Sequence, residues 1–235
     1  MSPSLLVAWY RELPELGRDD DPDLWGARRQ QAMHTFGLRV QARYAEGTLQ
    51  RLLNSESTIT RRAAVVALGA VGGMGSNPAL ARMLHDPDEA VTRRAAESLW
   101  AVWFRGSVPA HAKALARAIA LSDTARALAA LDALLREAPE FAEAYNQRAI
   151  LFFHNGAYAR SIRDCEAALR LNPFHFGAQA GIGQCFLKLR KPRSALRALR
   201  LALEINPTMS GLANTIRALE DGLGEGESHS DYLEG

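Results

Sequence analysis

The feature that most constrains this chain is a residue pattern in its second half that recurs after 34 positions. Six positions keep one register, and five of them carry the same residue in both copies. The first copy consists of Ala149, Phe152, Ala168, Leu169, Asn172 and Pro173, and the second consists of Gly183, Phe186, Ala202, Leu203, Asn206 and Pro207. Because a fixed period of this length is typical of stacked structural repeats, we expect a repeat array here.

Each 34-residue unit is predicted to be a pair of antiparallel helices. Apolar residues follow helical spacing twice within a unit, and polar breaks at residues 155–156 and 190–192 separate the two runs. Small residues such as Ala149 and Ala168 let the paired helices approach closely. Pro173 follows the second run, where proline ends a helix and fixes the approach to the next unit.

The residue types in these units point to a known family. Residues 144–149 read AYNQRA, and the positions that follow carry Gly156, Tyr158, Ser161, Ala168 and Pro173. This pattern resembles the tetratricopeptide repeat family over residues 142–175 and 176–209. The resemblance implies paired helices that stack into a right-handed superhelix with a concave groove.

The flanks of these two units are predicted from the same register. One unit earlier, residues 108–141 place Ala127, Leu131 and Pro139 on family positions, whereas Leu115 and Leu134 replace expected small residues. We interpret this segment as a degenerate repeat. Residues 210–223 read as one more amphipathic helix, which would cap the last apolar face.

A looser repeat organises the first half. Residues 59–64, ITRRAA, are echoed by residues 91–96, VTRRAA, and short apolar helices are expected before them at residues 49–54 and 80–85. The turns between the short and long helices, residues 55–58 and 86–89, are expected to supply helix-capping side chains. A short helix followed by a longer one resembles the HEAT and HEAT-like family, over roughly two repeats.

The predicted fold class is therefore all-α, a right-handed α-solenoid in which HEAT-like helical pairs precede about three tetratricopeptide repeats and a capping helix. Within the amino-terminal segment, residues 5–13 and 24–44 are expected to be helical. The expected domains are an N-terminal helical cap at 1–46, HEAT-like repeats at 47–106, the tetratricopeptide array with its capping helix at 107–223, and a disordered acidic tail at 224–235.

The resemblance implies that the first helix of each unit lines the groove. It assigns to a peptide-binding groove Asn146, Ile150, Phe153, His154, Gln184, Leu187, Lys188 and Asn214. Such a mixture of amide, apolar and basic groups suits an extended segment or a helix of another protein. The plain alternative is that each is an ordinary solvated helix position, since few residues carry most binding energy.

The expected function is a non-enzymatic protein-interaction scaffold whose partner is another protein or peptide segment. One subset of the family grips a peptide carboxyl terminus with basic residues and asparagines, but the matching positions here include Ala112, Asn146, Gly177 and Gly181, so that basic clamp is missing. The alternative function is a HEAT-type nucleic-acid-binding protein that uses surface arginines, for which salt-dependent binding would be diagnostic. A further alternative, a chromophore lyase with HEAT-like repeats, has no specific residue in its favour.

No catalytic, cofactor or metal site is expected. The six histidines lack ligand spacing, and the glycine-rich stretch at residues 69–75 follows a helix and ends without the Lys-Ser or Lys-Thr of a phosphate loop, so it is interpreted as a linker. The aspartates of residues 19–23 lack an EF-hand pattern. Cys165 and Cys185 are expected in the core. Arginines 193, 197 and 200 share a helix face that is expected to be solvated.

The compartment predicted from the sequence is the cytoplasm. The formal net charge of +2 is close to balance and indicates neither a polyanion nor a polycation partner. Residues 1–13 lack the leading positive charges of a secretory signal. The chain has no run of 18 apolar residues, which a membrane-spanning helix requires, and its two cysteines do not form a disulfide framework.

Overall fold

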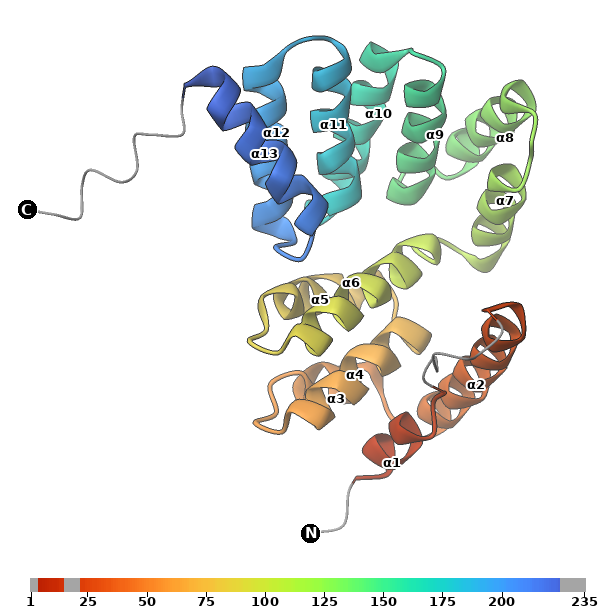
Figure 1. Cartoon of the computed structure of the whole chain (residues 1–235). Coiled ribbons are helices and arrows are strands. Elements are labelled where there is room, and N and C mark those ends of the chain that lie inside the picture. Colours follow the sequence, from red (N-terminus) through yellow and green to blue (C-terminus); the bar gives the residue numbers. More distant parts are fainter. Residues whose placement is uncertain (1–3, 15–21, 225–235) are drawn as a thin grey trace, which may run out of the picture. The chain divides into compact units, whose positions relative to one another are not determined.

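The computed structural model describes residues 4–14 and 22–224. Within these residues there are 13 α-helices, two short 3-10 helices and no strand. The all-helical prediction is therefore confirmed (Figure 1). The chain divides into two compact units, residues 1–103 and 104–235, and each is described by itself. The aspartates at positions 19–21 and the predicted tail beyond Gly224 lie outside the described residues.

The first unit consists of two short-then-long helix pairs preceded by two further helices. Its elements are α1 (Leu5–Arg11), α2 (Pro22–Arg43), α3 (Glu46–Leu52), α4 (Thr58–Val71), η1 (Met74–Ser76), α5 (Asn77–Arg82), η2 (Met83–His85) and α6 (Glu89–Phe104). Every residue of α4 from Ala63 to Gly69 is buried, and Leu49 of α3 and Leu80 of α5 are fully buried. The long helices α4 and α6 therefore carry most of this core.

Residues 69–71 lie inside α4 and residues 74–75 belong to η1, so the interpretation of residues 69–75 as a linker is wrong for all but residues 72 and 73. A methyl group at Gly69 would stand 2.7 Å from Cβ of Ser98 on α6, which is closer than real contacts allow. At this close approach the Ser98 hydroxyl donates to the carbonyl oxygen of Val65 at 3.0 Å. Close packing therefore outweighs the roughly 1 kcal/mol that glycine costs in a helix interior.

Paired arginines of α4 join the two helical repeats of this unit. Nε of Arg61 donates to Oδ2 of Asp86 at 2.7 Å, and Nη2 of Arg62 donates to Oδ2 of Asp88 at 2.6 Å. The hydrogen bonds from Arg62 lower the pKa of Asp88 to about 2. These bidentate pairs therefore hold the turn before α6 against α4.

The predicted capping side chains are present at one turn and absent at the other. Before α6, the backbone N–H of Val91 donates to Oδ1 of Asp88 at 2.9 Å, as expected. Before α4, the N-cap Ser57 makes no side-chain capping bond, so that prediction is wrong. The turn is held instead by Arg61, whose Nη1 donates to the carbonyl oxygens of Ser55 and Glu56.

The second unit is a row of helix pairs that ends in a single helix. Its elements are α7 (Pro109–Ile119), α8 (Thr124–Glu137), α9 (Ala142–His154), α10 (Tyr158–Leu171), α11 (Phe176–Lys188), α12 (Pro192–Ile205) and α13 (Ser210–Leu223). Each helix packs against the next one along the chain, as Figure 1 shows for α9 to α13. The helix predicted at residues 210–223 coincides with α13.

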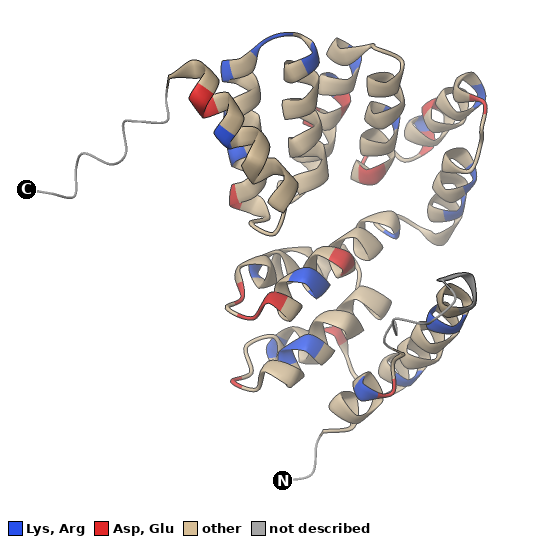
Figure 2. Cartoon of the chain, viewed as in Figure 1, with Lys and Arg blue, Asp and Glu red and all other residues tan. Residues whose placement is uncertain are grey.

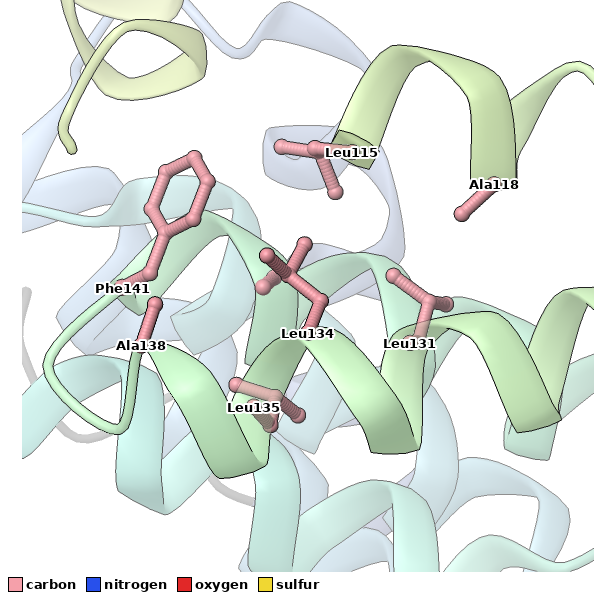
Figure 3. Packing of buried hydrophobic residues seen from close by; sticks show 8 residues of the cluster. Leu115, Ala118, Leu131, Leu134, Leu135, Ala138 and Phe141 are labelled. Atoms are coloured by element: carbon pink, nitrogen blue, oxygen red, sulfur yellow. The ribbon is translucent and has the colours of Figure 1, made fainter. Parts of the chain in front are cut away.

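The degenerate first pair has its own core. Leu115 of α7 and Leu131 and Leu134 of α8 are each at most 3% exposed and pack with Phe141, which precedes α9 (Figure 3). The leucines that depart from the family pattern thus fill the space between α7 and α8. The core between α7 and α8 is therefore filled by apolar side chains although the small residues of the family pattern are missing there.

Small residues and left-handed turns set the spacing of the later pairs. A methyl group at Gly183 would lie 2.6 Å from Cγ of Leu199, so α11 and α12 are closer than any larger residue would permit. Gly156 has φ 73° in the turn between α9 and α10, and Arg190, 34 positions later, has φ 56° in the equivalent turn. The backbone conformation of this turn is therefore retained although arginine adopts it less readily than glycine.

Candidate functional site

The first helices of the repeats, together with α13, carry the residues predicted to line a groove. Four of these lie on α9, three on α11 and one on α13. Because the period is 34, Phe153 and Leu187 occupy equivalent positions, as do His154 and Lys188, and as do Ile150 and Gln184. The predicted residues therefore form rows that run from one repeat to the next.

On α9, the predicted groove residues Ile150 and Phe153 form an apolar patch beside the imidazole ring of His154. Ile150 is 39% exposed although it is aliphatic, and His154 is exposed. The half-buried ring of Phe153 contacts the rings of His154 and Tyr158 edge-on, with centroids 5.7 and 5.6 Å apart. This aromatic contact fixes Phe153 beside the exposed side chains.

Asn146 differs from the other predicted groove residues because it is buried, with 3% exposed. Its Nδ2 donates to Oε1 of Glu143 at 3.1 Å. The amide is thus held within α9 and is not presented to solvent.

The α11 and α13 portions are more polar. Gln184 is half-buried, Lys188 and Asn214 are exposed, and Oδ1 of Asn214 accepts a hydrogen bond from Nη2 of Arg217 at 2.6 Å. Leu187 is partly buried against the cluster formed by α12 and α13. The surface therefore changes from apolar on α9 to amide and ammonium groups on α11.

Sequence reasoning missed Ile119, which lies 34 positions before Phe153 and is 44% exposed at the end of α7. It extends the row of Phe153 and Leu187 by one repeat. The signal was present, since shifting the register back by one unit reaches it directly. The residues of α7 depart from the family pattern, so the pattern alone did not mark this position.

A buried polar network fixes the base of α9 against α11. His175 and Glu143 are both fully buried in their side chains, and Nε2 of His175 lies 2.9 Å from Oε2 of Glu143. Because Nδ1 of His175 accepts the backbone N–H of Ala178, Nε2 is the nitrogen that donates to Glu143. Glu143 also accepts from Gln147 at 2.6 Å. One carboxylate therefore links the starts of two successive first helices.

A second charged group ties three helices together. Arg148 of α9 donates from Nη1 to Oδ1 of Asp132 on α8 and from Nε to Oδ2 of Asp164 on α10, each at 2.7 Å. The hydrogen bonds that Arg148 donates to Asp164 raise the pKa of the guanidinium above its ordinary value despite burial. The planar guanidinium therefore sets the position of α9 between its neighbours.

The two cysteines of the second unit lie in its core. Cys165 and Cys185 are free and buried, as predicted, and burial raises the pKa of Cys165 to about 12, which leaves the thiol unreactive. Arg193, Arg197 and Arg200 are exposed, and Figure 2 shows basic residues at the α11–α12 turn. In the part of the chain that is described, no cluster of three or more His, Cys, Asp or Glu side chains has the arrangement of a metal site.

None of the described helices is both long enough and apolar enough to span a bilayer.

Several of the arginines on which a nucleic-acid-binding role would depend form ion pairs within the chain. Arg61 and Arg62 pair with aspartates, and Arg94 pairs with Glu97 at 2.9 Å. The bidentate pairs leave Arg61 and Arg62 with fewer free donors for phosphates.

Two family models match the chain in succession. The model for HEAT repeats matches residues 13–100, and the model for the tetratricopeptide repeat matches residues 117–176 and 158–210. The chain contains HEAT repeats followed by tetratricopeptide repeats. The HEAT match begins at residue 13 and so includes α2, which sequence reasoning placed in a terminal cap.

Similar proteins share the tetratricopeptide part. A TPR repeat-containing protein of Rhizobium etli is 36% identical over 81 residues, which are 34% of this chain and 40% of that relative. The alignment thus spans well under half of the relative's length. Among solved structures, the first TPR of Spaghetti (RPAP3), bound to an HSP90 peptide, is 22% identical, covers 43% of this chain and 80% of its own, and has a TM-score of 0.41.

A second solved structure, MamA MSR-1 C2, is 14% identical, covers 71% of this chain and 89% of its own, and has a TM-score of 0.44. At these identities and scores, both structures are similar in their helical architecture alone.

Proposed function

We propose that the tetratricopeptide array is a non-enzymatic scaffold that binds a segment of another protein along its first helices. The observation that carries this proposal is an apolar row at repeat-equivalent positions, in which Ile119 is exposed and Phe153 is half-buried, with the exposed Ile150 beside it. Ile119 and Phe153 belong to this row, and Ile150 lies one turn away from Phe153 on α9. Exposed aliphatic and aromatic groups that gather in this way are typical of protein-binding surfaces.

The polar groups beside this row fit the same role. His154 and Lys188 form an adjacent repeat-equivalent row and are both exposed. Their donors, together with the amide of Gln184, can satisfy backbone carbonyls or acidic side chains of a bound segment. Asn146 serves as an internal support, because its amide is held by Glu143. The buried network beneath α9 keeps this surface preorganised, which lowers the entropic cost of binding.

A matched pair of variants tests the proposal. Ile150 on first helix α9 and Leu171 on second helix α10 are both 39% exposed, so Ile150→Asp and Leu171→Asp change similar side chains with similar exposure. We expect Ile150→Asp to reduce capture of protein partners at least about tenfold, because an unpaired carboxylate would be desolvated in the interface. Leu171→Asp should leave capture unchanged.

The measurement is quantitative mass spectrometry of proteins retained from the native host by each immobilised full-length variant. Circular dichroism of both variants controls for folding. Equal retention by the two variants, or retention of no protein by the unmodified chain, would show that the first-helix surface is not the binding site.

A further inference from the structure

A separate cavity of about 450 Å³ lies in the first unit among α1, α2, α4 and α6. It is not part of the surface proposed to bind protein, since all of its lining residues precede Trp103. Its volume lies within the range of about 300–1,000 Å³ that is typical of small-molecule sites. The first unit thus contains a space of ligand size that is partly open to solvent.

The polar part of the cavity wall has an excess of positive charge. Four arginines but a single glutamate line it. Arg29 on α2 and Arg94 on α6 both direct a guanidinium nitrogen at Oε2 of Glu97, at 3.4 and 2.9 Å. Since each guanidinium has five N–H donors, sharing one carboxylate leaves donors on both for another anion. Their side chains are 37% and 28% exposed, so a ligand can reach them.

Most of the remaining wall is apolar. Met33 of α2, Ile59 and Val66 of α4, and Ala101 of α6 line the same cavity. Arg62, also on the wall, is already bound in a bidentate pair to Asp88, so Arg29 and Arg94 are better placed to receive a new anion. Apolar side chains beside solvent-accessible guanidinium donors favour a ligand with an apolar body and one anionic group.

We propose that this cavity binds a small amphipathic carboxylic acid, whose carboxylate contacts Arg29 and Arg94 while its apolar body lies against Met33, Ile59 and Val66. The chemistry that is recognised is a carboxylate joined to an apolar group. A free acid and the carboxyl terminus of a peptide share it, so the experiment includes both. The proposal does not rest on the protein-binding function of the second unit.

The test is isothermal titration calorimetry of the full chain with 4-phenylbutyrate and with acetyl-Gly-Phe, each compared with its own amide. We expect at least one acid to bind with a Kd below about 1 mM and its amide to bind at least about tenfold more weakly. Tighter binding of the free acid would identify a metabolite-like ligand, and tighter binding of the peptide would identify a carboxyl terminus. Acetate, which has only a methyl group beside its carboxylate, should not bind measurably.

Three variants and one control variant locate the site. Arg29→Gln and Arg94→Gln should each weaken binding of the acid at least about tenfold, whereas Arg193→Gln, which removes an exposed charge from α12, should have no effect. Ala101→Leu should weaken binding without changing the charge, because it narrows the cavity. Absence of binding by both acids, equal binding of acid and amide, or an equal loss in Arg193→Gln would overturn the proposal.

Discussion

Substitution of His175 by alanine is expected to lower the unfolding free energy of the tetratricopeptide unit by about 3 kcal/mol or more. The side chains of His175 and Glu143 are fully buried, so the substitution leaves a carboxylate oxygen without the donor that satisfies it. The backbone N–H of Ala178 at the start of α11 also loses its acceptor. Both losses act at the same point, where α9 meets the next repeat.

Urea unfolding followed by circular dichroism at 222 nm measures this effect. All four tryptophans lie within residues 1–103, so tryptophan fluorescence follows unfolding of the first unit alone. A loss of circular dichroism that occurs without a change in fluorescence therefore belongs to the second unit. Glu166→Ala, at an exposed position of α10, is the control and should change stability by less than about 0.5 kcal/mol. A loss below about 1 kcal/mol in His175→Ala would contradict the role assigned to the network.

Substitution of Arg148 by methionine is the second large effect, with an expected loss of about 2–3 kcal/mol. Methionine keeps much of the aliphatic volume, but it leaves Asp164 on α10 without its bidentate partner. The side chain of Asp164 is only 9% exposed, so its charge would be poorly solvated. The expected loss of unfolding free energy is smaller than for a fully buried pair because the Arg148 side chain is 19% exposed.

The two aspartates provide the control for this substitution. Asp132 has a side chain that is 48% exposed, so Asp132→Asn should cost less than about 1 kcal/mol. Asp164→Asn should cost more, since it weakens the less exposed of the two contacts. The same urea titration compares the three variants. The account would be wrong if Asp132→Asn proved as damaging as Arg148→Met.

The helix pairs of the second unit could be predicted because their signal is periodic. The 34-residue recurrence placed the breaks near Gly156 and Arg190, and the structure has left-handed backbone at both positions. The helix at residues 210–223 was predicted at its observed bounds. Apolar periodicity reports which face of a helix is buried, and that information is sufficient to locate turns and pairs.

The contacts between helices could not be predicted in the same way. Asp132 and Asp164 stand 16 residues before and after Arg148, and this symmetry becomes meaningful only when α8 and α10 are known to flank α9. Glu143 and His175 are 32 residues apart, and buried ionisable side chains run against residue-type expectations. Pairing of this kind depends on the register of neighbouring helices, which hydrophobic pattern alone does not give.

In the candidate groove, too, the period predicts which helices carry the residues but not which contacts those residues make. The repeat register assigned its residues to the first helices, and six of the eight are at least partly exposed on α9 or α11. The burial of Asn146 depends on its bond to Glu143, which no pattern in the sequence predicts. The exposed Ile119 was accessible from the period, but the irregular residues of α7 obscured it.

Site-specific photocrosslinking in the native host tests the central claim most directly. A benzophenone side chain would replace Phe153 on α9 in one version of the full chain and the exposed Arg163 on second helix α10 in the other. The account predicts a covalent adduct with a second protein from position 153 and none from position 163. Adducts of equal yield from both positions, or an adduct from position 163 alone, would contradict it.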